Sequence, residues 1–387
     1  MRLSTIIIFP LMLAFNLSCR PAVLVEWVYT SSYDSAIHIR ALDTDKLMNV
    51  YLIGTTGYEI VFFKLNNQGT LEWTFNFGSV PDFVDQGVAC RVDSEGFVYI
   101  AGFFAGEIDF DPLHSGGVLV ALKGKEPDIF ICKYDSYGNL IWADSWDGPH
   151  WSSEGLPDTL IGLDFDKQGN VYLLDNLLWI INKDGKLLQV ESVSGQSICI
   201  DSLGNIIVAV DGFLAEMDEN AELKWRLPVG DSFWGMHIFI DSHDDIYADV
   251  FGDRPIMKID TNGHIIRKIG RDGFDYVLLC IDDLDNIYIR ADSILDSVTT
   301  EADSKTRVGQ IGIYINKLNQ EGRLLDAFNL KDIERGGGFG WRVAAVDRLG
   351  RLYVAGEYAG EFYLKNGTRE KKIVAGSNGI FVLKIII

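Results

Sequence analysis

Apolar and polar residues alternate along short stretches of this chain, and one such pattern returns seven times. Each copy has an apolar residue, an Asp, a tight turn that usually carries Gly or Asp, and alternating apolar residues around a Tyr or its substitute. The copies span residues 42–54, 92–102, 165–175, 200–210, 240–250, 281–291 and 346–356. A period of two residues predicts a β-strand with one face in a core. The Asp side chain can accept backbone N–H groups two residues on, so each copy predicts two strands joined by a hairpin turn.

A second unit follows the first in six of the seven repeats. It places an Asn or Asp three residues before the turn residue, which predicts another hairpin of the same kind. These residues are Asn66, Asp135, Asn182, Asp218, Asp260 and Asn319. Two hairpins make four antiparallel strands, called A to D, and a repeat of about 50 residues with this strand content indicates a β-propeller.

The two ends of the chain predict how the ring closes. The segment "AVLVEWVYT" (22–30) has the pattern of a strand D, and the last repeat stops after strand C in "NGIFVLKIII" (378–387). Pairing these segments leaves no free edge between the first and last blades. The predicted fold is therefore all-β, a seven-bladed β-propeller of four-stranded antiparallel blades in which the N-terminal strand completes the last blade. It forms a single domain over residues 22–387.

The first 18 residues have the pattern of a signal peptide. One Arg precedes an apolar run from Ile6 to Phe15, which is too short to span a bilayer. Leu17-Ser18-Cys19 resembles the end of a bacterial lipoprotein signal, in which the Cys is lipidated, although Asn16 stands where Leu is usual. We expect export to the bacterial cell envelope, as an outer-membrane-anchored, periplasmic or cell-surface protein, with lipidation at Cys19. Cleavage by an ordinary signal peptidase is the alternative.

The charge balance is strongly acidic, with 34 Lys and Arg residues against 55 Asp and Glu and a net charge of −21. Such a surface repels phosphate backbones and anionic membranes. Nucleic acid is therefore not an expected partner, and membrane contact is expected only through the lipid anchor. Calcium, cationic peptides and neutral glycans stay open, and the acidity also serves to keep a large β-rich surface soluble.

Three kinds of repeated side chain have structural interpretations. After Cys19, the remaining cysteines stand in apolar strands as expected free, buried thiols, although a Cys90–Cys132 bridge is open. These cysteines are Cys90, Cys132, Cys199 and Cys280. A Lys recurs at one position of strand C and a Trp at one position of strand D, which indicates packing. These residues are Lys64, Lys133, Lys258, Lys317 and Lys384, and Trp27, Trp73, Trp142 and Trp225.

The repeat resembles the bacterial SBBP β-propeller repeat. The best copy is "VDSEGFVYIAGFFAGEIDFDP" (92–112) followed by "DIFICKYDSYGNLIW" (128–142), and blades three to six are closer to NHL-like repeats. The resemblance covers most of residues 23–387. It implies an exported bacterial scaffold, and it supplies no agreed activity and no catalytic residues to carry over.

Loops of unequal length gather on one face of the predicted ring. With strand A innermost, the A–B and C–D turns form one face, the turn face, and the B–C and D–A loops form the other, the loop face. The B–C loops are long at 103–127, 291–311 and 357–378, whereas the A–B and C–D turns are uniformly short. Length variation confined to one face of a rigid ring indicates that the loop face meets the partner.

The D–A loops supply aromatic candidates for ligand binding at the mouth of the channel. Aromatic faces suit sugar rings, whose C–H groups stack on them, or a cationic peptide. The candidates are Tyr33, Phe83, Trp151, Phe233, Trp234, Phe274, Tyr276, Phe339 and Trp341. The alternative is that these aromatics close the mouth of the ring and wedge between blades.

Acidic residues offer weaker candidates for catalysis and metal binding. Carboxylates of the same loops could serve as acid and base of a glycan-directed hydrolase or lyase if burial and repulsion separate their pKa values. They are Asp34, Asp85, Asp158 and Glu154. Asp164 and Asp166 have oxygen-ligand spacing that calcium can use, although a plain hairpin turn is the favoured interpretation. His38 and His237 are expected in the core or the channel, and no nucleotide or nucleophile motif is present.

The sequence therefore predicts an exported, lipid-anchored, monomeric scaffold that binds a protein, peptide or carbohydrate through its loop face. No cofactor is expected, with calcium left open. The alternatives are a hydrolase or lyase that uses channel carboxylates and a purely structural component of the envelope.

Overall fold

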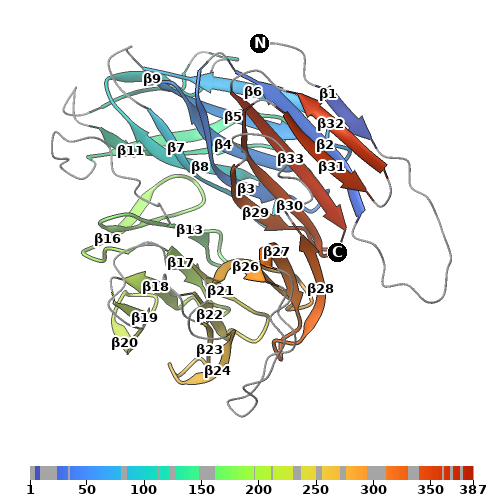
Figure 1. Ribbon diagram of the computed structural model, residues 1–387. Helices are drawn as coiled ribbons and strands as arrows, with labels where there is room; N and C mark the ends of the chain where they lie inside the picture. Colours follow the sequence, from blue (N-terminus) through green and yellow to red (C-terminus); the bar gives the residue numbers. More distant parts are fainter. Residues whose placement is uncertain are drawn as a thin grey trace.

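The computed structural model describes residues 5–8, 24–33, 35–79, 85–111, 113–114, 116–121, 127–147, 162–195, 197–210, 212–229, 237–249, 255–270, 276–293, 311–329, 340–359, 361–366, 369–374 and 378–386. These residues form six four-stranded antiparallel sheets and one five-stranded sheet, which follow one another around a ring (Figure 1). The prediction of seven blades is confirmed. Among the described residues, no helix is both long enough and apolar enough to cross a membrane.

Each blade contains four strands in the order A to D. Blade one has β3 (Ile37–Thr44), β4 (Val50–Thr56), β5 (Glu59–Leu65) and β6 (Leu71–Phe77); blade two has β7 (Gln86–Val92), β8 (Val98–Phe104), β11 (Asp128–Tyr134) and β12 (Leu140–Trp146). Blade three has β13 (Gly162–Phe165), β14 (Val171–Leu174), β15 (Leu178–Ile181) and β16 (Leu187–Glu191); blade four has β17 (Ser197–Ile200), β18 (Ile206–Val210), β19 (Phe213–Met217) and β20 (Leu223–Pro228). Blade five has β21 (Ile238–Ile240), β22 (Ile246–Ala248), β23 (Ile256–Ile259) and β24 (Ile265–Ile269); blade six has β25 (Tyr276–Ile281), β26 (Ile287–Ser293), β27 (Ile311–Leu318) and β28 (Leu324–Asn329). Blade seven has β29 (Gly340–Val346), β30 (Arg351–Tyr358), β33 (Gly379–Ile386) and β2 (Leu24–Ser32), and β1 (Thr5–Ile8) pairs with the outer edge of β2.

The first and last strands of the propeller close the ring. β2 pairs antiparallel with β33 from Leu24 opposite Ile386 to Ser32 opposite Gly379. The closure predicted from the two ends of the chain is therefore confirmed. In Figure 1, the strands β3, β7, β13, β17, β21 and β29 lie in the middle of the ring, and β6, β16, β20 and β24 lie at its rim.

The hydrophobic core lies between the blades. Strands β4, β8 and β11 are buried along their whole length, because both faces of a middle strand contact a neighbouring blade. The apolar side chains form seven clusters, each shared by two adjacent blades, and the cluster between blades one and two contains Tyr51, Phe62 and Phe130. The cysteines after residue 19 are free and buried, as expected.

The repeated Asp, Tyr and Lys form one structural unit in each of several blades. In blade one, Asp45 accepts the backbone N–H groups of Leu47 and Asn49 at 2.8 and 2.9 Å, and the Tyr51 hydroxyl donates to its second oxygen at 3.1 Å. The ammonium group of Lys64 lies 5.5 Å from the centre of the Tyr51 ring. The same Lys–Tyr contact recurs in four further blades, at Lys133–Tyr99, Lys258–Tyr247, Lys317–Tyr288 and Lys384–Tyr353. The structural interpretation of the repeated Lys is confirmed.

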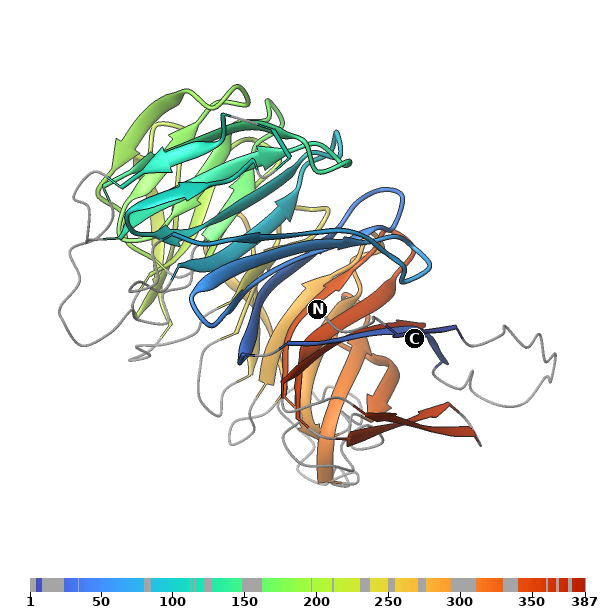
Figure 2. The ribbon, with the colours of Figure 1, turned by 90° about the horizontal axis from the view of Figure 1, so that it is seen from above.

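Two hairpins extend the loop face. β9 (Glu107–Asp109) pairs with β10 (Val118–Val120) in the B–C connection of blade two, and β31 (Glu361–Asn366) pairs with β32 (Arg369–Val374) in that of blade seven. Figure 2 shows the β31–β32 hairpin, in dark red, standing away from the ring. Both insertions fall within loops that the sequence predicts to be long.

Candidate functional site

The inner strands of all seven blades line a central channel with a volume of about 600 Å³. Because side chains alternate along a strand, the residue two positions before each turn Asp points inward. The seven residues at this position are Asp43, Arg91, Asp164, Cys199, Phe239, Cys280 and Ala345, and all of them line the channel. Among these seven, the charged residues belong to blades one to three, and the other blades contribute Cys, Phe or Ala.

Asp43, Arg91 and Asp164 form the charged part of the wall. The Arg91 guanidinium donates to Asp164 Oδ1 at 2.8 Å, and it lies close enough to Asp43 to affect its ionisation. Burial raises the pKa of Asp43, and the charge of Arg91 opposes this rise only in part. Burial lowers the pKa of Arg91, but the charges of Asp164 and Asp43 outweigh it and raise the net value. The Arg91 cation is therefore fixed between two carboxylates.

His237 enters the channel from blade five. Its Nδ1 lies 3.0 Å from Asp249 Oδ2, and its backbone N–H donates to Asp249 Oδ1 at 2.6 Å. Burial lowers the pKa of His237, but the charge of Asp249 and the hydrogen bond to it outweigh this effect, so the pKa is raised. The imidazole opens onto the channel, where it can hold a proton close to neutral pH.

Carboxylates at or near the channel also join four of the blades to the next. Asp43 accepts the Val92 N–H at 2.9 Å, Asp164 accepts that of Ile200 at 2.8 Å, and Asp249 accepts that of Leu278 at 2.8 Å. Across the closure, Glu357 accepts the Ile39 N–H at 3.0 Å. Inner strands have one free edge, and these bonds satisfy amides that a neighbouring strand would otherwise pair. Asp43 and Asp164 thus both stabilise the ring and line the channel.

The channel can bind a polar or charged molecule, and it offers groups that can donate or accept a proton. Among the residues the structure describes, there is no cluster of three or more His, Cys, Asp or Glu side chains arranged to hold a metal ion. Asp164 is engaged by Arg91 and Ile200. Asp166 caps its turn by accepting the N–H groups of Gln168 and Asn170 at 2.9 and 2.8 Å, as the hairpin interpretation predicts.

Three predicted residues of the channel mouth lie within the described ranges with their side chains. Tyr33 packs against the cluster between blades seven and one, and burial raises its pKa. Tyr276 is buried between blades five and six, with its ring against Gly270. Asp85 is completely buried, and it accepts hydrogen bonds from Ser79 and from the Ala105 N–H. Tyr33 and Tyr276 thus contact the interior of the ring, and Asp85 is held by hydrogen bonds.

The remaining predicted residues are not placed with their side chains. Trp341 lies in β29, opposite Gly356 of β30. The others lie outside the described residues: Cys19, Asp34, Phe83, Trp151, Glu154, Asp158, Phe233, Trp234, Phe274 and Phe339. Sequence reasoning missed Asp43 and Arg91, although their position two residues before the turn Asp was a signal that they point inward. It placed His237 in the core or the channel, and the channel is where it lies.

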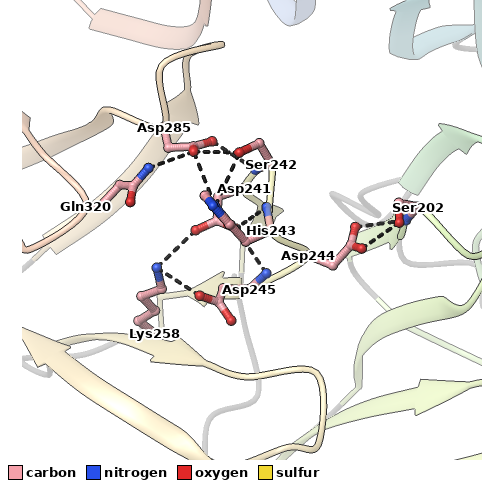
Figure 3. Close-up of polar contacts among 9 residues, drawn as sticks. All are labelled: Ser202, Asp241, Ser242, His243, Asp244, Asp245, Lys258, Asp285 and Gln320. Atoms are coloured by element: carbon pink, nitrogen blue, oxygen red, sulfur yellow. Dashed lines mark hydrogen bonds and ion pairs between the residues drawn. The ribbon is translucent and has the colours of Figure 1, made fainter.

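On the turn face, side chains link the A–B turns of blades four, five and six (Figure 3). Asp244 accepts the Ser202 N–H and hydroxyl at 2.8 and 2.6 Å, and Asp285 accepts the same groups of Ser242 at 2.8 and 2.7 Å. Lys258 lies 3.0 Å from both Asp241 and Asp245. These polar groups satisfy one another, so we assign this network a structural role.

The fold and the channel place the chain in the class of seven-bladed β-propellers. No protein-family model and no curated protein matches it. Among solved structures it is similar to virginiamycin B lyase from Staphylococcus aureus, with 11% identity, a TM-score of 0.55, and coverage of 93% of this chain and 99% of the lyase. A catalytically inactive form of that lyase with quinupristin has 11% identity, a TM-score of 0.53 and the same coverage. The C-terminal WD40 domain of Sif2 has 8% identity and a TM-score of 0.52, covering 92% of this chain and 98% of the domain. At these identities, the likeness shows the fold alone.

Proposed function

We propose that this protein is an exported, lipid-anchored propeller that binds a protein, peptide or glycan through its loop face. The β9–β10 hairpin is the observation that carries this proposal. Phe110 at its base is buried, and its carbonyl accepts the Tyr134 hydroxyl at 2.7 Å, so the hairpin is held firmly on blade two. The hairpin exposes Leu113, Val118 and Val120 to solvent. A rigid hairpin with exposed apolar side chains suits a binding surface.

The N-terminal strands support removal of a signal peptide. Among the described residues, six blades have four strands, and the sheet of blade seven has a fifth, β1, which overlaps the start of the apolar run predicted as the signal core. Removal of residues 1–18 would leave blade seven with four strands like the others. The resemblance of the repeats to the SBBP family also supports export. Cys19 would then be the first residue of the mature chain and carry the lipid.

The binding proposal is tested with a photo-reactive amino acid placed at Val120 in cells, and with the same group at Leu188. Leu188 is an equally apolar, exposed residue on the outer strand β16. We expect a specific crosslinked partner at Val120 alone, and titration of that purified partner should show binding that Val118→Glu with Val120→Glu abolishes. Equal crosslinking at both positions, or binding that survives the double substitution, would contradict the proposal. Loss of binding in Trp151→Ala and Trp341→Ala would extend the site to the channel mouth.

A lyase or hydrolase is the second candidate, and the His237–Asp249 pair in the channel favours it. A histidine whose pKa is raised by a buried carboxylate can act as a general acid near neutral pH. Incubation with quinupristin and with glycans, followed by mass spectrometry, would show turnover that His237→Ala removes. Absence of any product from the wild-type chain on these substrates would leave binding as the supported function. The channel itself counts against a purely structural role.

A further inference from the structure

Four A–B turns expose a leucine at the same position. It is the second residue after the turn Asp, and these leucines are Leu47, Leu203, Leu284 and Leu349, with 68%, 80%, 75% and 63% of their surface exposed. The other three blades carry polar residues there, Glu95, Gln168 and His243. Single exposed apolar residues are common, but four at equivalent places on one face of a ring form a pattern, and two of them, Leu47 and Leu349, lie on neighbouring blades where they can share one apolar partner.

The turn geometry holds these leucines outward. Asp45 accepts the Leu47 N–H at 2.8 Å, and Asp347 accepts that of Leu349 at 2.9 Å, so the backbone of each turn is fixed. These bonds are made by the backbone of the leucine, so any polar side chain would fit the position equally well. The leucine side chains therefore add nothing to the turn itself.

The leucines of blades seven and one stand beside cationic and aromatic groups. We call Lys46, Leu47, Tyr137, Arg348 and Leu349 the turn-face patch. Its first four members line a shallow hollow of about 770 Å³. The Lys46 ammonium donates to the neutral Ser94 carbonyl at 2.5 Å, and it has no ion pair with a carboxylate among the residues that the structure describes. The patch is thus apolar and basic, although the chain as a whole is acidic.

The propeller begins beside this patch. β2 is a strand D, so its first residue, Leu24, lies at the turn face opposite Ile386. Three residues later, the Trp27 indole donates to the Asn67 carbonyl at 3.0 Å, and the Asn67 amide donates to the Leu47 carbonyl at 3.3 Å. Two hydrogen bonds therefore connect the first strand to Leu47.

The position of Leu24 limits how far a lipid at Cys19 can be from the turn face. Leu24 is five positions after Cys19 in the sequence, and five residues of extended chain span at most roughly 18 Å. A lipid on Cys19 would hold the turn face, and not the loop face, close to the bilayer. Leu, Tyr, Lys and Arg together are the side chains that favour the boundary between acyl chains and anionic headgroups.

We propose that the turn-face patch docks on the surface of an anionic lipid bilayer. This inference rests on the lipid anchor of the proposed function. It orients the molecule with the blade seven–one sector of the turn face on the membrane and the loop face toward its partner. The sector of blades four and five carries Asp218, Glu219 and Asp244, which anionic headgroups would repel, so the ring is tilted.

The test places a fluorophore on either face of the same blade. Leu47→Cys carries it on the turn face, and Tyr58→Cys, in the exposed B–C turn between β4 and β5, carries it on the loop face. The four native cysteines of the propeller are buried, so labelling is confined to the introduced thiol. In the lipidated protein, reconstituted into phosphatidylcholine–phosphatidylglycerol vesicles, spin-labelled lipid should quench the probe at position 47 and leave that at position 58 bright. Equal quenching, or stronger quenching at position 58, would overturn the docking.

A second set of variants tests the leucines and separates this inference from the anchor. With the probe at Tyr137→Cys, we expect Leu47→Asp with Leu349→Asp to abolish quenching, and Leu188→Asp on the outer strand β16 to leave it unchanged. Retained quenching in the double variant would overturn the role of the patch. A wild-type protein that neither incorporates lipid nor sediments with vesicles would overturn the anchor and the docking together. A vesicle-bound protein with an unquenched probe at position 47 would overturn the docking alone.

Discussion

Four described residues other than glycine adopt positive φ angles, and they do so for different reasons. Met48, Ala221, Asp244 and Asp285 have φ values of 67°, 62°, 63° and 58°. This region of backbone space is unfavourable for L-residues other than glycine, and Asn and Asp tolerate it best. Asp244 and Asp285 gain a link to a serine of the preceding blade in exchange (Figure 3). Ala221 has no side-chain group that could make such a link.

Replacement by glycine should therefore raise the free energy of unfolding at Ala221 and lower it at Asp244. Ala221→Gly relieves the strain, and we expect the free energy of unfolding to rise by about 1 kcal/mol. Asp244→Gly relieves the same strain but loses two hydrogen bonds to Ser202, so we expect a net fall of about 1 kcal/mol. Denaturant titration measures both values. A gain of stability in both variants would mean that the Ser202–Asp244 link contributes nothing.

The His237–Asp249 pair makes stability depend on pH in one direction. An unfolded histidine has a pKa of about 6.5, and the pKa of His237 is raised in the folded state. Its contribution is therefore complete below about pH 6.5 and is lost as the pH rises through the folded-state pKa. We expect the melting temperature of the wild type to fall over this interval and that of His237→Gln to lack the fall. Identical pH profiles for the two proteins would contradict this assignment.

At the scale of the strand, outer tryptophans connect three of the blades to the blade that follows. Trp27, Trp142 and Trp225 lie in strand D of blades seven, two and four. Each packs against the glycine of the C–D turn of the following blade, which is Gly69, Gly185 or Gly263. Each indole N–H also donates to a carbonyl of that turn, at 3.0 to 3.1 Å. The expected packing role of these tryptophans is confirmed.

A comparison of two glycines with the same φ angle separates the effect of the tryptophan contact on stability from the effect of backbone strain. Gly185 and Gly204 both have a φ of 88°, but a Cβ at position 185 would lie 2.8 Å from the Trp142 ring, whereas position 204 has nothing within 4 Å. We expect Gly204→Ala to cost about 1 kcal/mol and Gly185→Ala about 2 kcal/mol more, because the indole must move. Thermal unfolding of the two variants measures the difference. Equal losses of stability in the two variants would show that the Trp142 ring can move aside without cost.

At the scale of the whole ring, stability depends on the pairing of β2 with β33, which closes the ring. Val28 of β2 is completely buried in the cluster between blades six and seven. We expect Val28→Asp to lower the free energy of unfolding by more than about 4 kcal/mol, since it buries an unpaired charge at the closure. Val190→Asp, on the exposed side of β16, should cost no more than about 0.5 kcal/mol.

Light scattering measures whether molecules that have lost the β2–β33 pairing associate with one another. A ring without β2 exposes the edge of β33, which invites pairing between molecules. The Val28→Asp variant should therefore form multimers while Val190→Asp stays monomeric. A monomeric, stable Val28→Asp variant would mean that the closure contributes little.

The repeated features were predictable from sequence, and those that depend on contacts between blades were not. Alternation and turn Asp residues predict seven blades, and the pattern around Trp27 predicts the closing strand. The channel charges can be identified only by counting back from the turn Asp, because bulges in β3 and β7, between Ile39 and Ala41 and between Gly87 and Ala89, break the alternation counted from the start of each strand. The Ser202–Asp244 link and the grouping of Leu47 with Arg348 require knowledge of which turns are neighbours. Most predicted residues of the channel mouth lie outside the described ranges, so their roles stay predictions.

The pairing of β2 with β33 also sets an order of events during biosynthesis. Leu24 of β2 lies opposite Ile386 of β33, 362 positions further along the chain (386 − 24). The β2 strand is synthesised long before β33 and must wait for it, and such distant pairing is slow. Until β33 is synthesised, β2 lacks the partner that joins it to blade seven and its facing edge stays unpaired. A truncation that removes β33 would therefore leave the ring open however many of the other blades have formed.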